Sequence, residues 1–225
     1  MKLDKIVPFG RSLDEYQSMF NLSDSDLDKK IIGIADGPAS FNAEMNDRGK
    51  SVLSIDPLYQ YGADEIDRQF YNVVDNIISQ VKNTPDNWSW SYHLSPDKLR
   101  ENRVNVIRKF IGDYETGKAE GRYVTGELPI LSIDGDDFDI ALCSHFLFLY
   151  SEQFDYQFHR AAILEMLRIA KEIRIFPLLT LELGKSPHLD TLINELHANG
   201  YEPTIKKVKY ELQKGGDEML RVVRA

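Results

Sequence analysis

The carboxylate of Asp56 lies 19 residues after Gly37, a spacing that suits the binding of a nucleotide ribose. Gly37 belongs to the turn DGPAS of residues 36–40, which follows the apolar run 31–35. A helix-compatible segment then leads to a second apolar run, 51–55, which ends at Asp56. Strand, small-residue turn, helix and acid-terminated strand is the order of a nucleotide-binding βαβ unit. In such a unit the turn amides approach the ligand and the acid accepts from both ribose hydroxyls.

The turn lacks the dinucleotide fingerprint G-x-G-x-x-G, because glycine and alanine alternate at positions 33, 35, 37 and 39. Little room is left beside such a turn for two phosphates. The turn therefore favours a smaller ligand, an adenosine that carries an amino-acid tail. The alternative interpretation is an ordinary strand-turn-helix unit with a tight Gly-Pro turn.

Length and composition suit one α/β domain, residues 1–225, because 42% hydrophobic residues are enough for a sizeable core. No stretch approaches the roughly 18 apolar residues of a membrane span, and the start lacks the apolar run of a signal peptide. The single cysteine, Cys143, excludes an internal disulfide, so a cytoplasmic location is expected. The formal net charge of −9 disfavours nucleic acid as a partner, and the lysines of 206–209 suit a solvated strand edge.

The alternation of strand and helix patterns predicts an α/β fold with a Rossmann-like, mostly parallel seven-stranded sheet, an antiparallel C-terminal hairpin and a helical insertion. Strands are expected at 31–35, 51–55, 123–125, 138–143, 172–176, 204–212 and 218–223. The Gly-Gly pair within 214–217 is expected to form the hairpin turn between the last two strands, and Ser186-Pro187 to start a helix.

The N-terminal segment 1–29 is expected to be helical, with Ser12 and Glu15 forming a capping box at the start of its first helix. Arg11 precedes this box and follows Gly10. Its guanidinium could hold a ligand carboxylate, but a surface ion pair is the favoured interpretation.

Residues 59–121 are expected to form the helical insertion, because they contain two helical stripes and no good strand. The insertion is too long for an ordinary crossover and is interpreted as a helical layer over the ligand crevice. Its tip carries Trp88, Trp90, Tyr92 and His93. These side chains could line a substrate pocket, but packing between the insertion and the body is the favoured interpretation.

The chain resembles the class I S-adenosylmethionine-dependent methyltransferases over residues 31–56 and 123–225. The resemblance is carried by GIADGPASF, by SID, by ELPILSIDGDDFDIALCSHFLFLY and by the C-terminal hairpin. More narrowly, PFGRSLDEYQSMF, DGPASFNAE and SHFLFLYSEQ resemble a bacterial branch of that superfamily. The resemblance implies S-adenosyl-L-methionine as cofactor and methyl transfer to an acceptor, expected to be a small molecule.

The resemblance also implies a set of cofactor-binding residues. They are Asp36, Gly37, Pro38, Ala39, Asp56, Pro57, Glu127, Leu128 and Ser144. The sequence departs from the family pattern at Gly33, which replaces an acid within the first strand, and at Ala35 and Ala39, which replace glycines. The missing acid puts the contact to the cofactor amino group in doubt, and Asp36 could take it over.

The resemblance places His145 beside the transferred methyl, as the candidate catalytic residue. Methyl transfer from a sulfonium needs alignment and, for a hydroxyl or amine acceptor, a base that takes a proton. His145 is either that base or a residue that shapes the pocket. Cys143 as a nucleophile is a weaker alternative to inert burial. No metal is expected, because the remaining histidines show no ligand spacing.

Two other functions stay open. The altered glycine turn is compatible with an inactive cofactor-binding module, and the βαβ unit with a nicotinamide-dependent oxidoreductase, although the phosphate fingerprint is absent. The sequence indicates neither the acceptor nor the oligomeric state.

Overall fold

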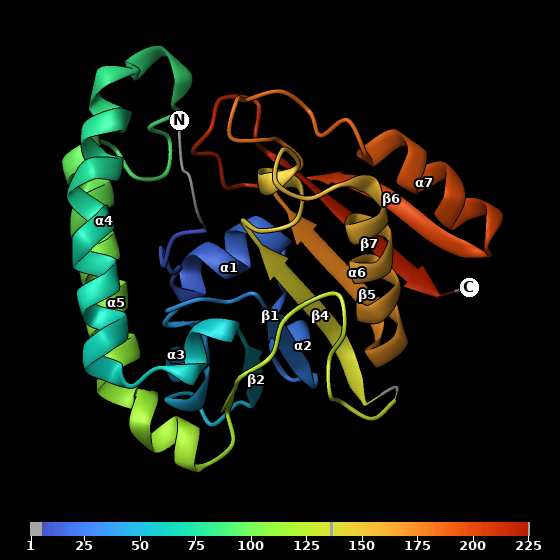
Figure 1. Ribbon diagram of the computed structural model, residues 1–225, viewed down its shortest axis with the longest axis horizontal. Helices are drawn as coiled ribbons and strands as arrows, with labels where there is room; N and C mark the ends of the chain where they lie inside the picture. Colours follow the sequence, from blue (N-terminus) through green and yellow to red (C-terminus); the bar gives the residue numbers. More distant parts are fainter. Residues whose placement is uncertain (1–5, 136, 225) are drawn as a thin grey trace.

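The computed structural model describes residues 6–135 and 137–224, and within them the strands form one seven-stranded sheet (Figure 1). The order across the sheet is β3-β2-β1-β4-β5-β7-β6. The strands are β1 (Ile31–Ile34), β2 (Val52–Ile55), β3 (Tyr123–Val124), β4 (Phe138–Ser144), β5 (Ala170–Phe176), β6 (Tyr201–Lys207) and β7 (Glu218–Arg224). Strand β7 pairs antiparallel with both β5 and β6, and the pairs between β1, β2, β3, β4 and β5 are parallel. The predicted sheet, with its antiparallel C-terminal pair, is confirmed.

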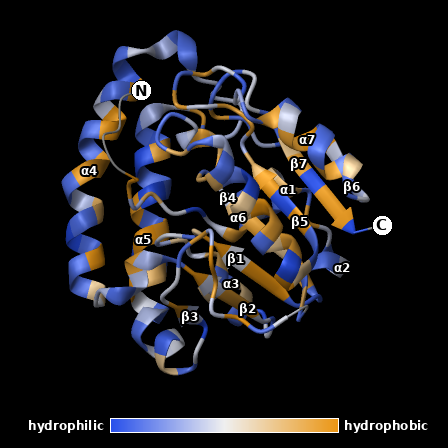
Figure 2. Cartoon of the chain, turned by 45° about the vertical axis from the view of Figure 1, so that its right-hand side comes forward, coloured by the Kyte–Doolittle hydropathy of each residue, from blue (hydrophilic) through white to orange (hydrophobic). Residues whose placement is uncertain are grey.

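Alternate residues of the central strands face two separate cores. Ile31 and Leu142 belong to the core beneath the N-terminal helices, whereas Ile32 and Cys143 belong to the opposite core. This alternation follows from the two-residue repeat of a strand, and it explains why both neighbours along each strand are apolar. The first core packs against α1 (Leu13–Phe20), α2 (Asp24–Leu27) and α3 (Phe41–Asn46), and the second against α6 (Tyr156–Ile169) and α7 (Leu189–Ala198). Figure 2 shows the apolar colouring along the strands between these layers.

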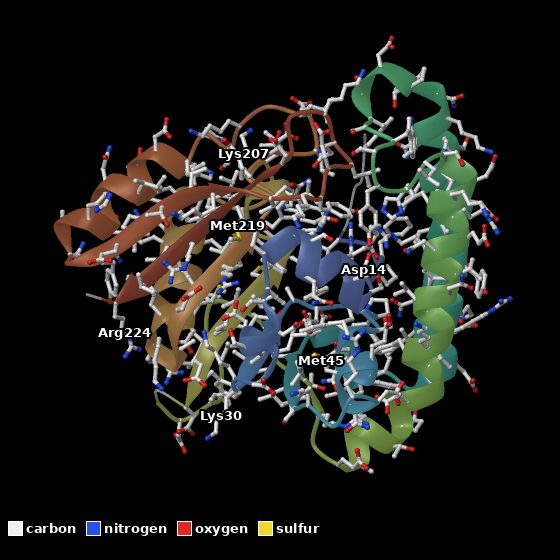
Figure 3. The ribbon with its side chains drawn as sticks, turned by 180° about the vertical axis from the view of Figure 1, so that it is seen from behind. Asp14, Lys30, Met45, Lys207, Met219 and Arg224 are labelled. Carbon is white, nitrogen blue, oxygen red and sulfur yellow. The ribbon has the colours of Figure 1, made fainter. Side chains whose placement is uncertain are left out.

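The helical insertion is confirmed as a long pair of helices, α4 (Ala63–Asn83) and α5 (Pro96–Ala119) (Figure 1). Short 3₁₀ helices η1 (Pro57–Gln60) and η2 (Pro85–Asn87) lie before α4 and between the pair. Residues on the inner stripes of both helices join the core that also contains β1, so the insertion packs as a layer on the body. Seen from behind, α1 with Asp14 lies between the sheet and this helical pair (Figure 3).

The aromatic tip of the insertion packs against the body, as the favoured interpretation predicted. Trp88 is 3% exposed and belongs to the main core. The Tyr92 hydroxyl donates to Asp14 on α1, and its ring lies 4.8 Å from that of Tyr210. His93 is buried within hydrogen-bond distance of the Tyr210 hydroxyl, at 3.0 Å. The tip therefore fastens the insertion to α1 and to the C-terminal part of the chain.

Two local predictions near the C-terminus are wrong. Strand β6 ends at Lys207, and the Gly-Gly segment is not a tight turn between adjacent strands. The connection 208–217 instead pairs with the tip of the insertion, where Ser89 N–H donates to Leu212 O at 2.8 Å and Lys214 N–H donates to Asn87 O at 3.0 Å. These long-range bonds replace the ladder bonds that a longer β6 would make.

The starts of α1 and α5 follow the capping rules. The capping box of Ser12 and Glu15 is present at α1, and Ser95 caps α5 by accepting from Lys98 N–H. Ser186-Pro187 does not begin a helix, because α7 starts at Leu189. Within the described residues no helix has the length and apolar character needed to cross a bilayer.

Candidate functional site

A cavity of about 460 Å³ lies at the carboxyl ends of the parallel strands. Its lining comes from residues at or just beyond the ends of four of them, at 35–37, 56–58, 126–128 and 144–146. The N-terminal segment closes it with Val7, Pro8, Phe9 and Arg11. Strands β1 and β4 are neighbours with connections leading to opposite sides, which makes this edge the topological switch point where α/β sheets bind ligands. The volume is within the usual range for small-ligand sites.

The structure brings most of the predicted site residues together. Those that line the cavity are Asp36, Gly37, Asp56, Pro57, Glu127, Leu128, Ser144 and His145. Pro38 and Ala39 are buried outside the lining. The carbonyl of Pro38 packs against Gly10, where an added Cβ would lie 2.1 Å from its oxygen. Only glycine therefore allows the N-terminal segment to lie this close to the turn. Contact of any of these residues with a cofactor stays a prediction.

The carboxylate of Asp36 occupies the space left by the missing acid of β1. A Cβ on Gly33 would lie 1.9 Å from Asp36 Oδ2, so the glycine makes room for this side chain. The Tyr16 hydroxyl donates to Oδ1 at 2.5 Å, and the Ser54 hydroxyl donates to Oδ2 at 2.7 Å. Burial raises the pKa of Asp36 to about 6, although both hydrogen bonds oppose this shift.

Asp56 fixes the glycine turn to the end of β2. Its Oδ2 accepts from Gly37 N–H and its Oδ1 from Leu58 N–H, both at 2.8 Å. The Tyr59 hydroxyl donates to Gly37 O at 2.7 Å, so both backbone groups of Gly37 are held. Gly37 has a φ of +55°, which favours glycine, and nothing lies within 4 Å of where its Cβ would be. Burial raises the pKa of Asp56 to about 6, against the two backbone hydrogen bonds.

Neither carboxylate has a cationic partner among the described residues, since the bonds of Asp36 come from hydroxyls and those of Asp56 from amides. Buried carboxylates are usually paired with cations, because taking an unpaired charge out of water is costly. Two such groups on one cavity therefore suit a ligand that carries positive charge.

Two non-glycine residues of the cavity have left-handed backbone conformations. Ala35 has a φ of +55° and directly follows β1. His145 has a φ of +52° and directly follows β4. This conformation costs an L-residue roughly 1–2 kcal/mol and is concentrated at functional sites. Backbone N–H groups hold both residues in place: Ala35 donates to Ile55 O at 2.8 Å, and His145 donates to Phe176 O at 2.6 Å.

His145 lines the cavity as a neutral imidazole. Burial, together with the nearby Arg11 and Arg103 guanidinium groups, holds its pKa well below the ordinary value. Its Nδ1 lies 2.9 Å from the Ser144 hydroxyl. The ring packs against Phe176, with centroids 5.3 Å apart. A neutral imidazole can accept a proton, and its lowered pKa makes it a weaker base than an exposed histidine.

Arg11 is not a surface ion pair, so the interpretation favoured from sequence is wrong. Its side chain lines the cavity and makes no ion pair with any described residue. One guanidinium nitrogen donates to Phe9 O, while Nε is buried with no hydrogen-bond partner. Burial and the nearby Arg103 lower its pKa to about 10, so Arg11 is a cation at neutral pH.

Sequence reasoning missed a buried network behind the cavity. Glu15 accepts a bidentate pair of hydrogen bonds from Arg103, both at 2.7 Å, in addition to its capping bond. The Tyr210 hydroxyl donates to the same carboxylate at 3.1 Å. The partners are separated by 88 and 195 residues, so local patterns gave no signal for them.

The cavity also has an aromatic wall that the sequence analysis did not single out. Phe154 and Phe158 stack with centroids 4.1 Å apart, and Phe146 lies 5.4 Å from Phe154. No group of three or more metal-ligating side chains occurs in the described ranges. Cys143 is buried, and burial raises the pKa of its thiol to about 12, which fits inert packing rather than a nucleophile.

The strand order with an antiparallel β7, and a cavity at the carboxyl ends of the parallel strands, define the class I methyltransferase fold. No protein-family model matches the chain. Uncharacterized protein MJ0045 from Methanocaldococcus jannaschii is 36% identical over 225 residues, which cover 100% of this chain and 99% of that protein. The chain belongs to the same family as this archaeal protein.

Some solved structures are similar to this chain at low identity. A magnesium protoporphyrin IX methyltransferase (ChlM) from Synechocystis PCC 6803, with bound S-adenosylmethionine, is 13% identical with a TM-score of 0.47, over 90% of this chain and 73% of that chain. The glycopeptide N-methyltransferase MtfA is 9% identical with a TM-score of 0.47, over 95% and 94% of the two chains. Likeness at this level has no bearing on substrate or activity.

Proposed function

We propose that this protein is an S-adenosylmethionine-dependent methyltransferase that acts on a small-molecule acceptor. The proposal rests on two buried carboxylates, Asp36 and Asp56, which lie on either side of Gly37 at the topological switch point. Neither has a cationic partner among the described residues. A sulfonium nucleoside with an ammonium group suits this charge, whereas the anionic pyrophosphate of a dinucleotide does not.

The lining residues fit the parts of this cofactor. Asp56 would accept from the ribose hydroxyls, because each of its oxygens retains acceptor capacity beyond the backbone bond it already makes. Leu128, 6% exposed, would pack on the adenine, with Glu127 at its edge. Asp36 would hold the ammonium group. When bound, S-adenosylmethionine supplies an electrophilic methyl group.

The remaining side chains of the cavity would bind and orient the acceptor. The aromatic wall excludes water from one side, and His145 could take a proton from an acceptor hydroxyl or amine. A smaller cavity of about 60 Å³, mostly apolar, shares Arg11 and His145 with the main one. The main cavity, of about 460 Å³, has the volume of a small-molecule site, and the net charge of −9 disfavours nucleic acid.

The test is transfer of a labelled methyl group from S-adenosylmethionine to the small-molecule fraction of a cell extract. We expect the wild type to label a compound, also after dialysis against a chelator, and Asp36→Asn to label it more slowly. Asp47→Asn is a matched control, because Asp47 is exposed at the end of α3. Thermal shift by NAD but not by S-adenosylmethionine would refute the proposal, and binding without transfer would favour the inactive module.

A further inference from the structure

Arg11 is the one cation, among the described residues, that lines the main cavity or the smaller one. It belongs to the walls of both, together with Val7, Phe9 and His145, so the two spaces meet at these side chains. Its guanidinium donates to Phe9 O, its Nε is buried with no hydrogen-bond partner, and it makes no ion pair with a described residue. An unpaired cation at such a place is costly, and a bound anion would offset its charge.

The fold keeps the nearest buried carboxylate along the chain from neutralising Arg11. Glu15 lies four residues further on, but Arg103 donates to both of its oxygens at 2.7 Å. The guanidinium groups of Arg11 and Arg103 lie over the ring of Phe9, 5.5 Å and 5.0 Å from its centroid. Arg103 therefore neutralises Glu15, and the charge of Arg11 remains available to a ligand.

The smaller cavity has the lining and the volume of a pocket for an apolar group. Its walls include Ile77 and Leu99 of the helical insertion, Leu149 of the 3₁₀ helix η3 (Phe148–Tyr150) and Leu212 of the connection 208–217. Gln213 also lines it, but its amide nitrogen already donates to Thr180 O at 2.9 Å. A water molecule needs about 10–15 Å³ of such space, so about 60 Å³ suits a group of roughly four to six heavy atoms, a branched alkyl chain or a ring.

The smaller cavity and Arg11 lie beside the candidate base. His145 lines both cavities and directly follows β4. After burial, the charge of Arg11 is the next cause of the low pKa of His145, so the guanidinium and the imidazole are near each other. A molecule held at Arg11 would therefore lie next to the imidazole, whereas Asp36 and Asp56 approach the main cavity from the glycine turn and the end of β2.

The electrostatics of the main cavity favour an anion with a single charge. Arg11 faces this cavity together with three acidic side chains, those of Asp36, Asp56 and Glu127. A phosphate group carries between one and two negative charges at neutral pH, and these carboxylates would repel it. A carboxylate carries one charge, and its two oxygens match the planar fork of a guanidinium.

We propose that the methyl acceptor is a monocarboxylate with an apolar body, whose carboxylate pairs with Arg11 and whose apolar group enters the smaller cavity. This inference rests on the proposed function and adds the chemical class of the acceptor. It also gives the helical insertion a part in substrate selection, because α4 and α5 supply walls of the smaller cavity.

The test separates the small-molecule fraction of a cell extract by charge before the methyl-transfer assay. The fraction is passed over a strong anion-exchange resin at pH 7, and bound compounds are eluted first with a volatile acid at pH 2 and then with concentrated salt. Carboxylates gain a proton below a pKa of about 4 and leave the resin in the acid, whereas phosphate and sulfate esters stay bound until salt is added. We expect the wild type to transfer a labelled methyl group from S-adenosylmethionine to a compound of the acid eluate.

Dilutions of the acid eluate then measure how each variant depends on acceptor concentration. Arg11→Met should raise the concentration for half-maximal labelling about tenfold to hundredfold, the range for losing hydrogen bonds to a charged group. Arg11→Lys should raise it less, because it keeps the charge without the fork. Leu149→Phe, which enlarges a side chain in the wall of the smaller cavity, should raise it as well. The matched control is Arg108→Met, since Arg108 is exposed on α5.

The outcomes separate the inference from the proposed function. Labelling from the acid eluate that weakens in Arg11→Met and Leu149→Phe supports the inference, and calorimetric binding of S-adenosylhomocysteine at wild-type affinity shows that both variants are folded. Labelling only from the unbound fraction or the salt eluate overturns the inference and leaves the methyltransferase proposal in place. An unchanged acceptor dependence in either variant, or an equal loss of S-adenosylhomocysteine affinity in Arg11→Met, overturns it as well. A wild type that labels nothing in the whole extract overturns the proposed function and the inference with it.

Discussion

Asp56 is the residue whose removal tests the cofactor site most directly, because it has two separable roles. Its oxygens accept from Gly37 N–H and Leu58 N–H, which fixes the turn and caps η1. The same carboxylate lines the cavity, where we expect it to accept from both ribose hydroxyls. Asp56→Ala removes both roles. Asp56→Asn keeps one carbonyl oxygen and places an amide N–H₂ where the other oxygen was.

The capping role of Asp56 affects the free energy of unfolding, and its ribose-binding role affects ligand affinity, and the two effects differ in size. Loss of a capping side chain costs about 1 kcal/mol of stability, so Asp56→Ala should remain folded with a modestly lower free energy of unfolding. Hydrogen bonds to a charged group contribute about 1.5–3 kcal/mol each, and competition with water makes about 2 kcal/mol a safe value for the ribose pair. That value corresponds to roughly 30-fold in affinity.

Calorimetry on the folded variant measures the effect. S-adenosylmethionine and S-adenosylhomocysteine should weaken alike, because they share the ribose. Asp56→Asn should weaken both as well, with a smaller loss of stability since one cap bond can persist. Asp47→Ala, at an exposed position outside the cavity, is the control. Wild-type affinity for either ligand in a folded Asp56→Ala protein would refute the role of this carboxylate in ribose binding.

Three further outcomes are expected. His145→Ala should lower turnover by about 100-fold or more if the imidazole is the base, with donor affinity nearly unchanged; an unchanged rate at saturating acceptor would reduce His145 to a packing residue. The pKa of Asp36, raised to about 6, means that this carboxyl gains a proton as the pH falls from 7 to 5. An ammonium ligand prefers the ionised form, so S-adenosylhomocysteine affinity should fall across that window, and less steeply in Asp36→Asn; equal slopes would contradict the contact. Arg103→Met takes the guanidinium away from the buried Glu15 carboxylate and leaves it with the Tyr210 hydroxyl, the Ser12 N–H and His93, whose Nε2 lies 3.3 Å away. The substitution should lower the free energy of unfolding by about 3 kcal/mol in urea titrations, whereas Arg108→Met should stay within about 0.5 kcal/mol.

The sequence by itself determined the parts of the fold that depend on neighbouring residues. The apolar runs of β1 and β4 and the capping box of Ser12 and Glu15 appear where local rules place them. The spacing of Gly37 and Asp56 also placed both on one cavity, because the carboxyl ends of parallel strands meet at one edge of a sheet.

Tertiary packing decided what the sequence left open or misassigned. Arg11 faces the cavity instead of solvent because Gly10 allows the N-terminal segment to lie on Pro38. The end of β6 is set by the insertion tip, which pairs with residues 208–217 through bonds that no local pattern encodes.

The acid that is missing from the first strand, where Gly33 stands, shows most clearly what the sequence and the tertiary structure each determine. From sequence, Gly33 was a departure from the family pattern, and Asp36 was a possible replacement three residues later. Whether a carboxylate can reach back over its own strand depends on the turn conformation and on partners from elsewhere, here Tyr16 of α1 and Ser54 of β2. Residue types and spacing determine which groups are available, but only the packed chain brings donors from separate elements within hydrogen-bond distance and removes the water that would otherwise compete with them.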